Sequence, residues 1–182
     1  TYTDTAGASL TDGTLISKEG KAQITAHGVL QLKKLSAKDS ATVEADHDVT
    51  LTEAEAGTLA ISSGGSVNAG TLTAKTGDAS VTAKKDVTIG TLNAKEHAEL
   101  TSGGDMVLHE AEAGGTLTAD AGGSISVKET NAKISGSTIE MTAGEDIRIT
   151  DRSPVGKLDG VDTSLPAGQT TGSGEAGSLV IG

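Results

Sequence analysis

The chain has 182 residues, a formal net charge of −11, no cysteine, no tryptophan and no phenylalanine, and its one aromatic residue is Tyr2. The lack of cysteine excludes a disulfide framework, a thiolate metal site and a cysteine nucleophile. The lack of aromatic rings leaves little that stacks on bases or sugar rings. The acidic charge argues against a nucleic-acid partner, because nucleic acids select basic surfaces. No apolar run approaches the roughly 20 residues of a transmembrane helix, and no signal-peptide pattern opens the sequence.

A short pattern recurs along the chain: an apolar residue, any residue, Ala or Ser, two turn residues, a polar residue, and two apolar residues separated by one position. Clear copies run from Val81 to Ile89 and from Leu100 to Leu108. One equivalent apolar position falls at residues 30, 49, 67, 87, 106, 125 and 147, so the steps are 19, 18, 20, 19, 19 and 22 residues. Such a period indicates a repeat protein, in which a single copy cannot bury its apolar face and neighbouring copies stack.

Each copy also carries an upstream apolar pair, such as Leu72 and Ala74. Around that pair, apolar residues alternate with polar ones in three segments, which are separated by Gly77-Asp78, Lys84-Lys85 and Gly90. Alternation at period two predicts strands, and the many Thr, Ser, Gly and β-branched residues disfavour helix. We therefore expect an all-β fold, a right-handed parallel β-helix of about seven three-strand turns with a period of about 19 residues. Its narrow interior suits small and aliphatic side chains and leaves no room for rings.

The repeats occupy residues 14–150. Residues 1–13 are predicted to be an entry segment or loop, including the stretch from Leu10 to Gly13. Residues 151–182 contain both prolines, Pro154 and Pro166, and are predicted to be a loop or linker in which Ser178–Ile181 opens a further strand. Neither end resembles the polar cap of a solenoid, so we expect the chain to be a piece of a longer protein.

The sequence resembles the filamentous haemagglutinin family, the large exoproteins of two-partner secretion in Gram-negative bacteria. The resemblance lies in the 19-residue repeat, in the Leu-x-Ala-Lys phrases, and in Gly-Gly-[Asp/Ser]-apolar-x-apolar phrases such as Gly103–Leu108 and Gly122–Val127. It covers roughly residues 14–150 and includes no counterpart of the family's secretion domain. It implies a secreted or cell-surface protein that reaches the outside through an outer-membrane transporter.

One candidate cation site is a set of aspartates at the same position of successive copies: Asp48, Asp86, Asp105 and Asp146. Calcium takes six to eight oxygens from a converging loop, and the nine-residue Gly/Asp repeat of calcium-binding β-helices is absent. We interpret each aspartate as accepting a backbone N–H at the turn that enters a strand. The acids of the C-terminal stretch, Asp151, Asp159 and Asp162, are interpreted as part of a solvated loop.

The four histidines form no His-Glu-x-x-His motif; they are His27, His47, His97 and His109. His27 and Asp46 occupy equivalent turn positions in adjacent copies, which predicts a surface contact between them. The Thr-x-Thr pairs typical of ice-binding β-helices occur at Thr71/Thr73 and Thr116/Thr118, but the pattern fails at Ala60 and Asn93. Two basic pairs, Lys33-Lys34 and Lys84-Lys85, are expected in solvated turns, with contact to acidic glycans as the alternative.

The sequence therefore predicts no catalytic, cofactor-binding or metal-binding residue. The resemblance implies a non-catalytic shaft segment of an adhesin that attaches to a host-cell receptor or glycan. One alternative is the stalk of a contact-dependent growth inhibition protein or a cytolysin. The alternative from another class is a β-helical polysaccharide-degrading enzyme, against which the lean repeats and the lack of aromatic residues argue.

Overall fold

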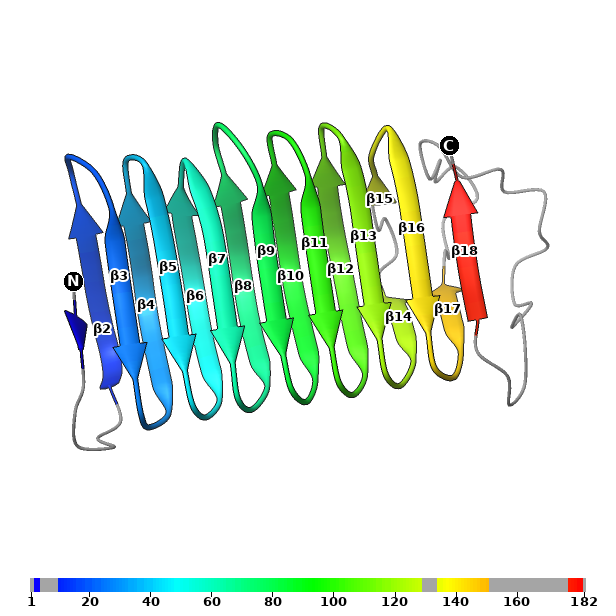
Figure 1. The fold of residues 1–182 in the computed structure, drawn as a ribbon, viewed down its shortest axis with the longest axis horizontal. Helices are drawn as coiled ribbons and strands as arrows, with labels where there is room; N and C mark the ends of the chain where they lie inside the picture. Colours follow the sequence, from blue (N-terminus) through cyan, green and yellow to red (C-terminus); the bar gives the residue numbers. More distant parts are fainter. Residues whose placement is uncertain (1, 4–9, 129–133, 151–176, 182) are drawn as a thin grey trace.

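The computed structural model describes residues 2–3, 10–128, 134–150 and 177–181. All regular structure in these residues is β-strand, and the strands form a solenoid of about seven turns (Figure 1). The predicted fold class, an all-β parallel β-helix with a period of about 19 residues, is confirmed.

Two sheets of parallel strands make up the walls of the solenoid, with one antiparallel strand at the C-terminal end. Sheet A contains, in spatial order, β1 (Tyr2–Thr3), β3 (Ala22–Ala26), β5 (Ser40–Ala45), β7 (Thr58–Ser63), β9 (Ala79–Ala83), β11 (Ala98–Ser102), β13 (Thr116–Ala121), β16 (Thr138–Ala143) and β18 (Gly177–Ile181). Sheet B contains β2 (Leu10–Ser17), β4 (Leu30–Ala37), β6 (Val49–Ala56), β8 (Val67–Ala74), β10 (Val87–Ala94), β12 (Met106–Ala113), β14 (Ile125–Lys128) and β17 (Ile147–Thr150). A short strand, β15 (Ile134–Ser135), also pairs with β12.

Neighbouring turns pair in register, so that equivalent residues of successive turns stand side by side. Leu100 of β11 is opposite Val81 of β9, and Leu108 of β12 is opposite Ile89 of β10. We call each such series of equivalent residues a column. The last predicted step of 22 residues, from Ile125 to Ile147, takes in the split of the sheet B strand into β14 and β15.

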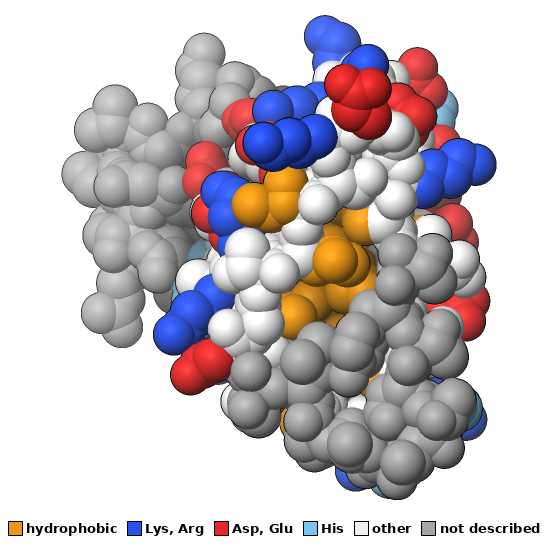
Figure 2. Space-filling model, turned by 90° about the vertical axis from the view of Figure 1, so that its left-hand side faces the viewer, with side chains coloured by type: hydrophobic (Ala, Val, Ile, Leu, Met, Phe, Trp, Pro, Cys, Tyr) orange, Lys and Arg blue, Asp and Glu red, His pale blue; other side chains and the backbone are white. Residues whose placement is uncertain are grey.

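The core is a single apolar cluster that runs through the interior between the two sheets. In β9, Ala79, Val81 and Ala83 are buried, whereas the residues between them are not. Figure 2, seen from the N-terminal end, shows apolar side chains in the middle and charged side chains around the rim. Small and aliphatic side chains fill this interior, as the composition predicts.

The prediction of three strands per turn is wrong in detail, because each regular turn has two. Gly90, expected to be a turn residue, lies inside the eight-residue strand β10. Val87, Ile89, Leu92 and Ala94 of that strand are buried, so two consecutive residues between Ile89 and Leu92 face outward. This change of phase bends the strand without ending it. The sequence pattern of three alternating segments therefore corresponds to two strands, one of them bent.

Both ends of the described fold differ from expectation. Strand β2 begins at Leu10, where a loop was expected, and its register with β4 shifts between Leu10 and Thr14. Asp12, at the irregularity, has a φ of 57°, a left-handed conformation that aspartate tolerates better than most residues. At the other end, the predicted strand at Ser178–Ile181 exists as β18, but it pairs antiparallel with β16 and does not continue the parallel turns. Residues 151–176, including both prolines, lie outside the described residues.

Replacing Val87 with Asp is expected to lower the unfolding free energy by about 3–5 kcal/mol, because Val87 is fully buried and a carboxylate there has no partner. For a chain of this length the melting temperature should fall by roughly 10 °C. Circular dichroism during heating measures the change, with Thr88→Asp as the outward-facing control. A melting temperature within a degree or two of the parent would contradict the inward placement of Val87.

Candidate functional site

The loop that leads from each sheet A strand to the next sheet B strand contains the aspartate column. Asp48 Oδ1 accepts the backbone N–H of Ser66 at 2.8 Å. Asp86 Oδ1 accepts that of Asp105 at 2.9 Å, and Asp105 Oδ1 accepts that of Ser124 at 2.8 Å. The prediction that the column aspartates accept a backbone N–H is confirmed for these three, whereas Asp146 accepts a hydrogen bond from Arg148 Nη2. The N–H belongs to the equivalent residue of the next turn, however, so each carboxylate bonds one turn to the next.

A glycine makes room for each of these carboxylates. A Cβ atom added to Gly104 would lie 2.2 Å from Asp86 Oδ1, a separation that real Cβ atoms do not show. Gly65 stands in the same relation to Asp48, and Gly123 to Asp105. An aspartate in one turn therefore requires a glycine in the next, immediately before the residue whose N–H it accepts.

The sequence follows this rule through all described turns. The three column positions without aspartate are Val29, Ser66 and Ser124, and the corresponding residues of the following turns are His47, Lys85 and Glu145. A glycine is present where the carboxylate is present, and a larger side chain where it is absent. The coupling between an aspartate in one turn and a glycine in the next can be read from the sequence when equivalent positions of successive turns are compared. The spacing of apolar residues alone does not reveal it.

The aspartate column has no geometry for a cation. Within the described ranges, no group of three or more His, Cys, Asp or Glu side chains converges on a point where a metal ion could bind. The carboxylates already accept backbone N–H groups along the column, which is a structural role. The predicted acids Asp151, Asp159 and Asp162 lie outside the described residues.

The predicted contact between His27 and Asp46 is confirmed, since His27 Nδ1 and Asp46 Oδ2 are 2.7 Å apart on the surface. The hydrogen bond from His27 holds the pKa of the Asp46 carboxyl below its ordinary value. The positive charges of His27, His47 and Lys84 act in the same direction, while desolvation opposes them. The pair resembles a surface ion pair, and within the described ranges it belongs to no group of three or more potential metal ligands.

The other histidines are placed separately. His97 lies at the opposite corner of the solenoid, where its Nδ1 accepts the backbone N–H of Thr116 at 3.0 Å. Asp78 makes the equivalent hydrogen bond one turn earlier, because its Oδ1 accepts the backbone N–H of His97 at 2.9 Å. His109 is in β12, on the outer side of sheet B. Sequence reasoning missed the role of His97, because no motif distinguishes a histidine that accepts a backbone N–H.

The basic pairs differ from each other. Lys33 and Lys34 lie at the bend of β4, where two consecutive side chains face outward. Lys33 pairs with Asp12 at 3.3 Å, and Lys34 pairs with Glu53 at 2.9 Å. Lys84 and Lys85 are exposed at the corner after β9, and no salt bridge joins them to the described residues. The pair Lys84-Lys85 is therefore the freer of the two.

The Thr-x-Thr pairs do not form one surface. Thr71 and Thr73 belong to β8 in sheet B, and Thr116 and Thr118 belong to β13 in sheet A. A flat threonine array needs neighbouring turns of the same sheet, so these two pairs cannot combine.

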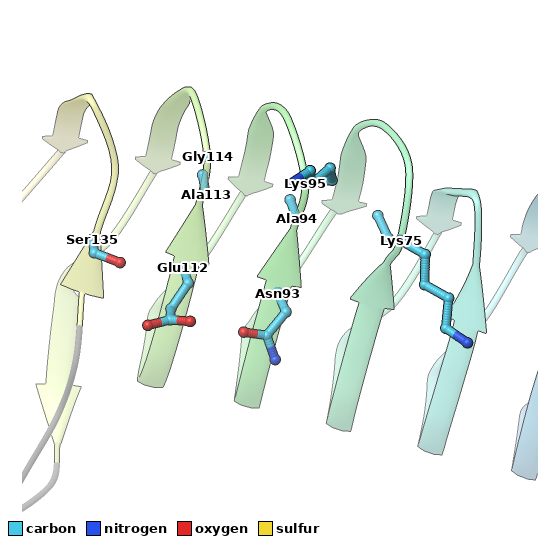
Figure 3. A pocket seen from close by; sticks show the side chains of 9 residues that line it. Lys75, Asn93, Ala94, Lys95, Glu112, Ala113, Gly114 and Ser135 are labelled. Carbon is cyan, nitrogen blue, oxygen red and sulfur yellow. The ribbon is translucent and has the colours of Figure 1, made fainter.

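An open groove of about 460 Å³, which no sequence pattern predicts, lies at the ends of β8, β10 and β12. Its polar lining comprises Lys75, Asn93, Lys95, Glu112 and Ser135 (Figure 3). The side chain of Lys75 extends away from the groove, and its Nζ pairs with Glu55 Oε1 at 2.6 Å. Among the described residues that line the groove, Glu112 carries the carboxylate and Lys75 and Lys95 carry the ammonium groups.

Comparison with protein-family models, with curated proteins and with solved structures found no match. Within the described part of the chain, no helix is long and apolar enough to span a membrane.

Gly104→Ala is expected to lower the unfolding free energy by about 1–3 kcal/mol, because the new Cβ displaces the Asp86 carboxylate from the Asp105 N–H. Asp86→Ser removes the carboxylate and costs about 1 kcal/mol. The double variant should be less destabilised than the sum of the two, because no carboxylate remains to clash. Thermal unfolding of the parent, the two single variants and the double variant measures the coupling between the two positions. The control is Lys85→Ala, because Lys85 occupies the position equivalent to Gly104 in a turn that follows Ser66 and meets no column carboxylate. Strict additivity would contradict the rule.

The Asp46 carboxyl should titrate below its ordinary range, and His27→Ala should raise its pKa towards the ordinary value. A lowered pKa in the folded state stabilises the fold above about pH 4, and this contribution disappears as the pH falls through the lowered value. The stability advantage of the parent over Asp46→Asn should therefore be present at neutral pH and shrink in acid. Carboxyl ¹³C shifts and melting temperatures at several pH values measure both effects. An Asp46 titration that is identical with and without His27 would refute the pairing.

Proposed function

We propose that this chain is a non-catalytic shaft segment of a large secreted or cell-surface adhesin of the filamentous haemagglutinin type, which mediates attachment to host cells. The observation that carries the proposal is the regular stacking of the described turns. Both corners consist of short loops whose side chains bond to the next turn, as Asp86 does to Asp105. Such a structure extends in one direction by adding turns, which is what a shaft requires.

The distribution of chemistry agrees with this proposal. Several polar groups at the corners, including Asp48 and His97, are engaged in bonds between turns. The Gly-Gly-[Asp/Ser] phrases that carry the resemblance serve the same stacking, because Gly104 and Gly123 make room for carboxylates. Variation remains possible at the outward positions of the strands, where a receptor or glycan would bind. The secretion route through a two-partner transporter follows from the resemblance alone.

Two other functions use the same architecture. A stalk of a contact-dependent inhibition protein or of a cytolysin has the same shaft and differs in domains beyond it. A polysaccharide-degrading enzyme needs a cleft with converging acids, and the groove at Lys95 and Glu112 contains a single carboxylate in its lining. The shaft of an adhesin is the function that the described residues support best.

An antibody raised against the chain is expected to label intact cells of the source organism or to detect the protein in the culture medium. A signal that appears only after lysis would overturn the proposed location. Incubation of the purified chain with acidic polysaccharides should yield no unsaturated or shortened products above background. Product formation that grows with protein concentration would overturn the non-catalytic assignment.

Binding of the labelled chain to host cells and to a glycan array distinguishes a binding shaft from a passive one. If the shaft binds acidic glycans, Lys84→Ala/Lys85→Ala should abolish the signal, because these lysines have no salt bridge to the described residues. The matched control is Lys33→Ala/Lys34→Ala, whose lysines already pair with Asp12 and Glu53. Equal loss in both variants would point to bulk charge and would contradict a site at Lys84-Lys85.

A further inference from the structure

Strand β17 is the last strand of sheet B, and among the described strands it pairs only with β14. Asp146, which precedes it, belongs to the aspartate column. Asp48, Asp86 and Asp105 each accept a backbone N–H from the next turn, whereas no backbone N–H of the described residues donates to Asp146. Its Oδ2 accepts a hydrogen bond from Arg148 Nη2 at 2.5 Å instead. The side of β17 away from β14 thus carries a carboxylate acceptor and a row of backbone groups that pair with no other described strand.

The column rule states which sequence fits this edge. The strand needs a glycine where a Cβ would meet the Asp146 carboxylate, then a residue that donates its N–H, then two apolar residues separated by one position. Gly123-Ser124-Ile125-Ser126-Val127 meets these requirements beside Asp105. Gly177-Ser178-Leu179-Val180-Ile181 has the same pattern, and it follows Asp146 in the chain.

The structure places this segment elsewhere, as β18 antiparallel to β16. Leu179 pairs with Met141 and Ile181 with Ile139, and both partners are buried. In a parallel register on β17, Leu179 would be opposite Ile147, which is also buried, and Ile181 opposite Ile149. Leu179 would therefore be opposite a buried apolar residue in either arrangement, and Ile181 would be opposite an isoleucine in either, because the side-chain period of a strand is two.

We propose that the edge of β17 away from β14 is a second docking site for Gly177–Ile181, in parallel register, with the Ser178 N–H donating to Asp146 Oδ1. The antiparallel pairing with β16 and the parallel pairing with β17 are then alternative positions of one segment. Docking on β16 closes the edge of sheet A. Docking on β17 extends sheet B by one strand and leaves the edge of β16 open to a further strand. This inference rests on the fold and is independent of the proposed function.

Disulfide trapping in the full chain tests the proposal. No native thiol competes with an introduced pair, because the chain has no cysteine. Arg148→Cys/Val180→Cys reports the parallel register, and Glu140→Cys/Val180→Cys reports the antiparallel one, in which Glu140 pairs with Val180. Paired residues on adjacent strands lie about 5 Å apart, within the Cα range of disulfides. The positive control is Ser126→Cys/Arg148→Cys, a pair that the structure places side by side. Mild oxidation at low protein concentration, followed by mass spectrometry of peptides, identifies each bond.

Formation of both the 148–180 and the 140–180 bonds is expected, and formation of the 148–180 bond alone also supports docking on β17. The 140–180 bond alone, or neither bond while the control pair forms, would overturn the proposal. A 148–180 bond found only in covalent dimers would show that a second copy supplies the strand, which also overturns it.

A glycine substitution tests the column rule at the same site. Gly177→Ala should cause loss of the 148–180 bond, because the Cβ would meet the Asp146 carboxylate as it would at Gly104 beside Asp86. The 140–180 bond should persist, since that register does not involve Asp146. Adding Asp146→Ser should restore the 148–180 bond. A 148–180 bond that forms equally well with Gly177→Ala would refute the parallel register.

Discussion

The constraint on which this structure depends is that each turn lies in register on the one before it. Parallel pairing places every residue beside its equivalent about 19 positions earlier, as Leu100 lies beside Val81. The choice of one residue therefore limits the choice one turn away. The clearest case is the carboxylate of Asp86, which bonds the N–H of Asp105 and requires glycine at position 104. In such a fold the contacts between turns can be read from sequence spacing, because residues that are neighbours on adjacent turns are separated by one period.

This equivalence explains why so much could be predicted from the sequence. Spacing of apolar residues identified the turns, and the residues expected inside, such as Leu72, Val81 and Val87, are fully buried. The contact between His27 and Asp46 followed from their equivalent places in adjacent copies. No knowledge of tertiary structure beyond the period was needed, since the period itself defines which side chains meet.

The failures have an equally physical origin. The alternation of apolar residues shows which side chains face inward. A one-residue shift in that alternation looks the same in the sequence whether the strand ends in a turn or continues through a bend. At Gly90 the chain bends within β10, so the predicted third strand of each turn is absent. The groove near Lys95 depends on how far long side chains extend at a corner, which periodicity does not encode. The direction of β18 also escaped prediction, because a five-residue strand with alternating apolar residues fits either polarity.

Inward-facing residues and corner residues are constrained by different requirements. Inward residues are limited to small and aliphatic types by the narrow interior, and corner residues such as Asp105 and His97 are limited by bonds between turns. Within the part of the chain that the structure describes, outward strand positions and exposed corner lysines, Lys84 among them, are free of both limits. Among the described residues, those positions are therefore the ones at which a binding surface could vary without disturbing the solenoid. Since side chains of one column repeat at the spacing of adjacent strands, about 4.8 Å, a partner that contacts several turns would meet a linear and periodic surface. An extended polymer matches that geometry better than a compact ligand, which would touch too few turns to gain much from the repetition.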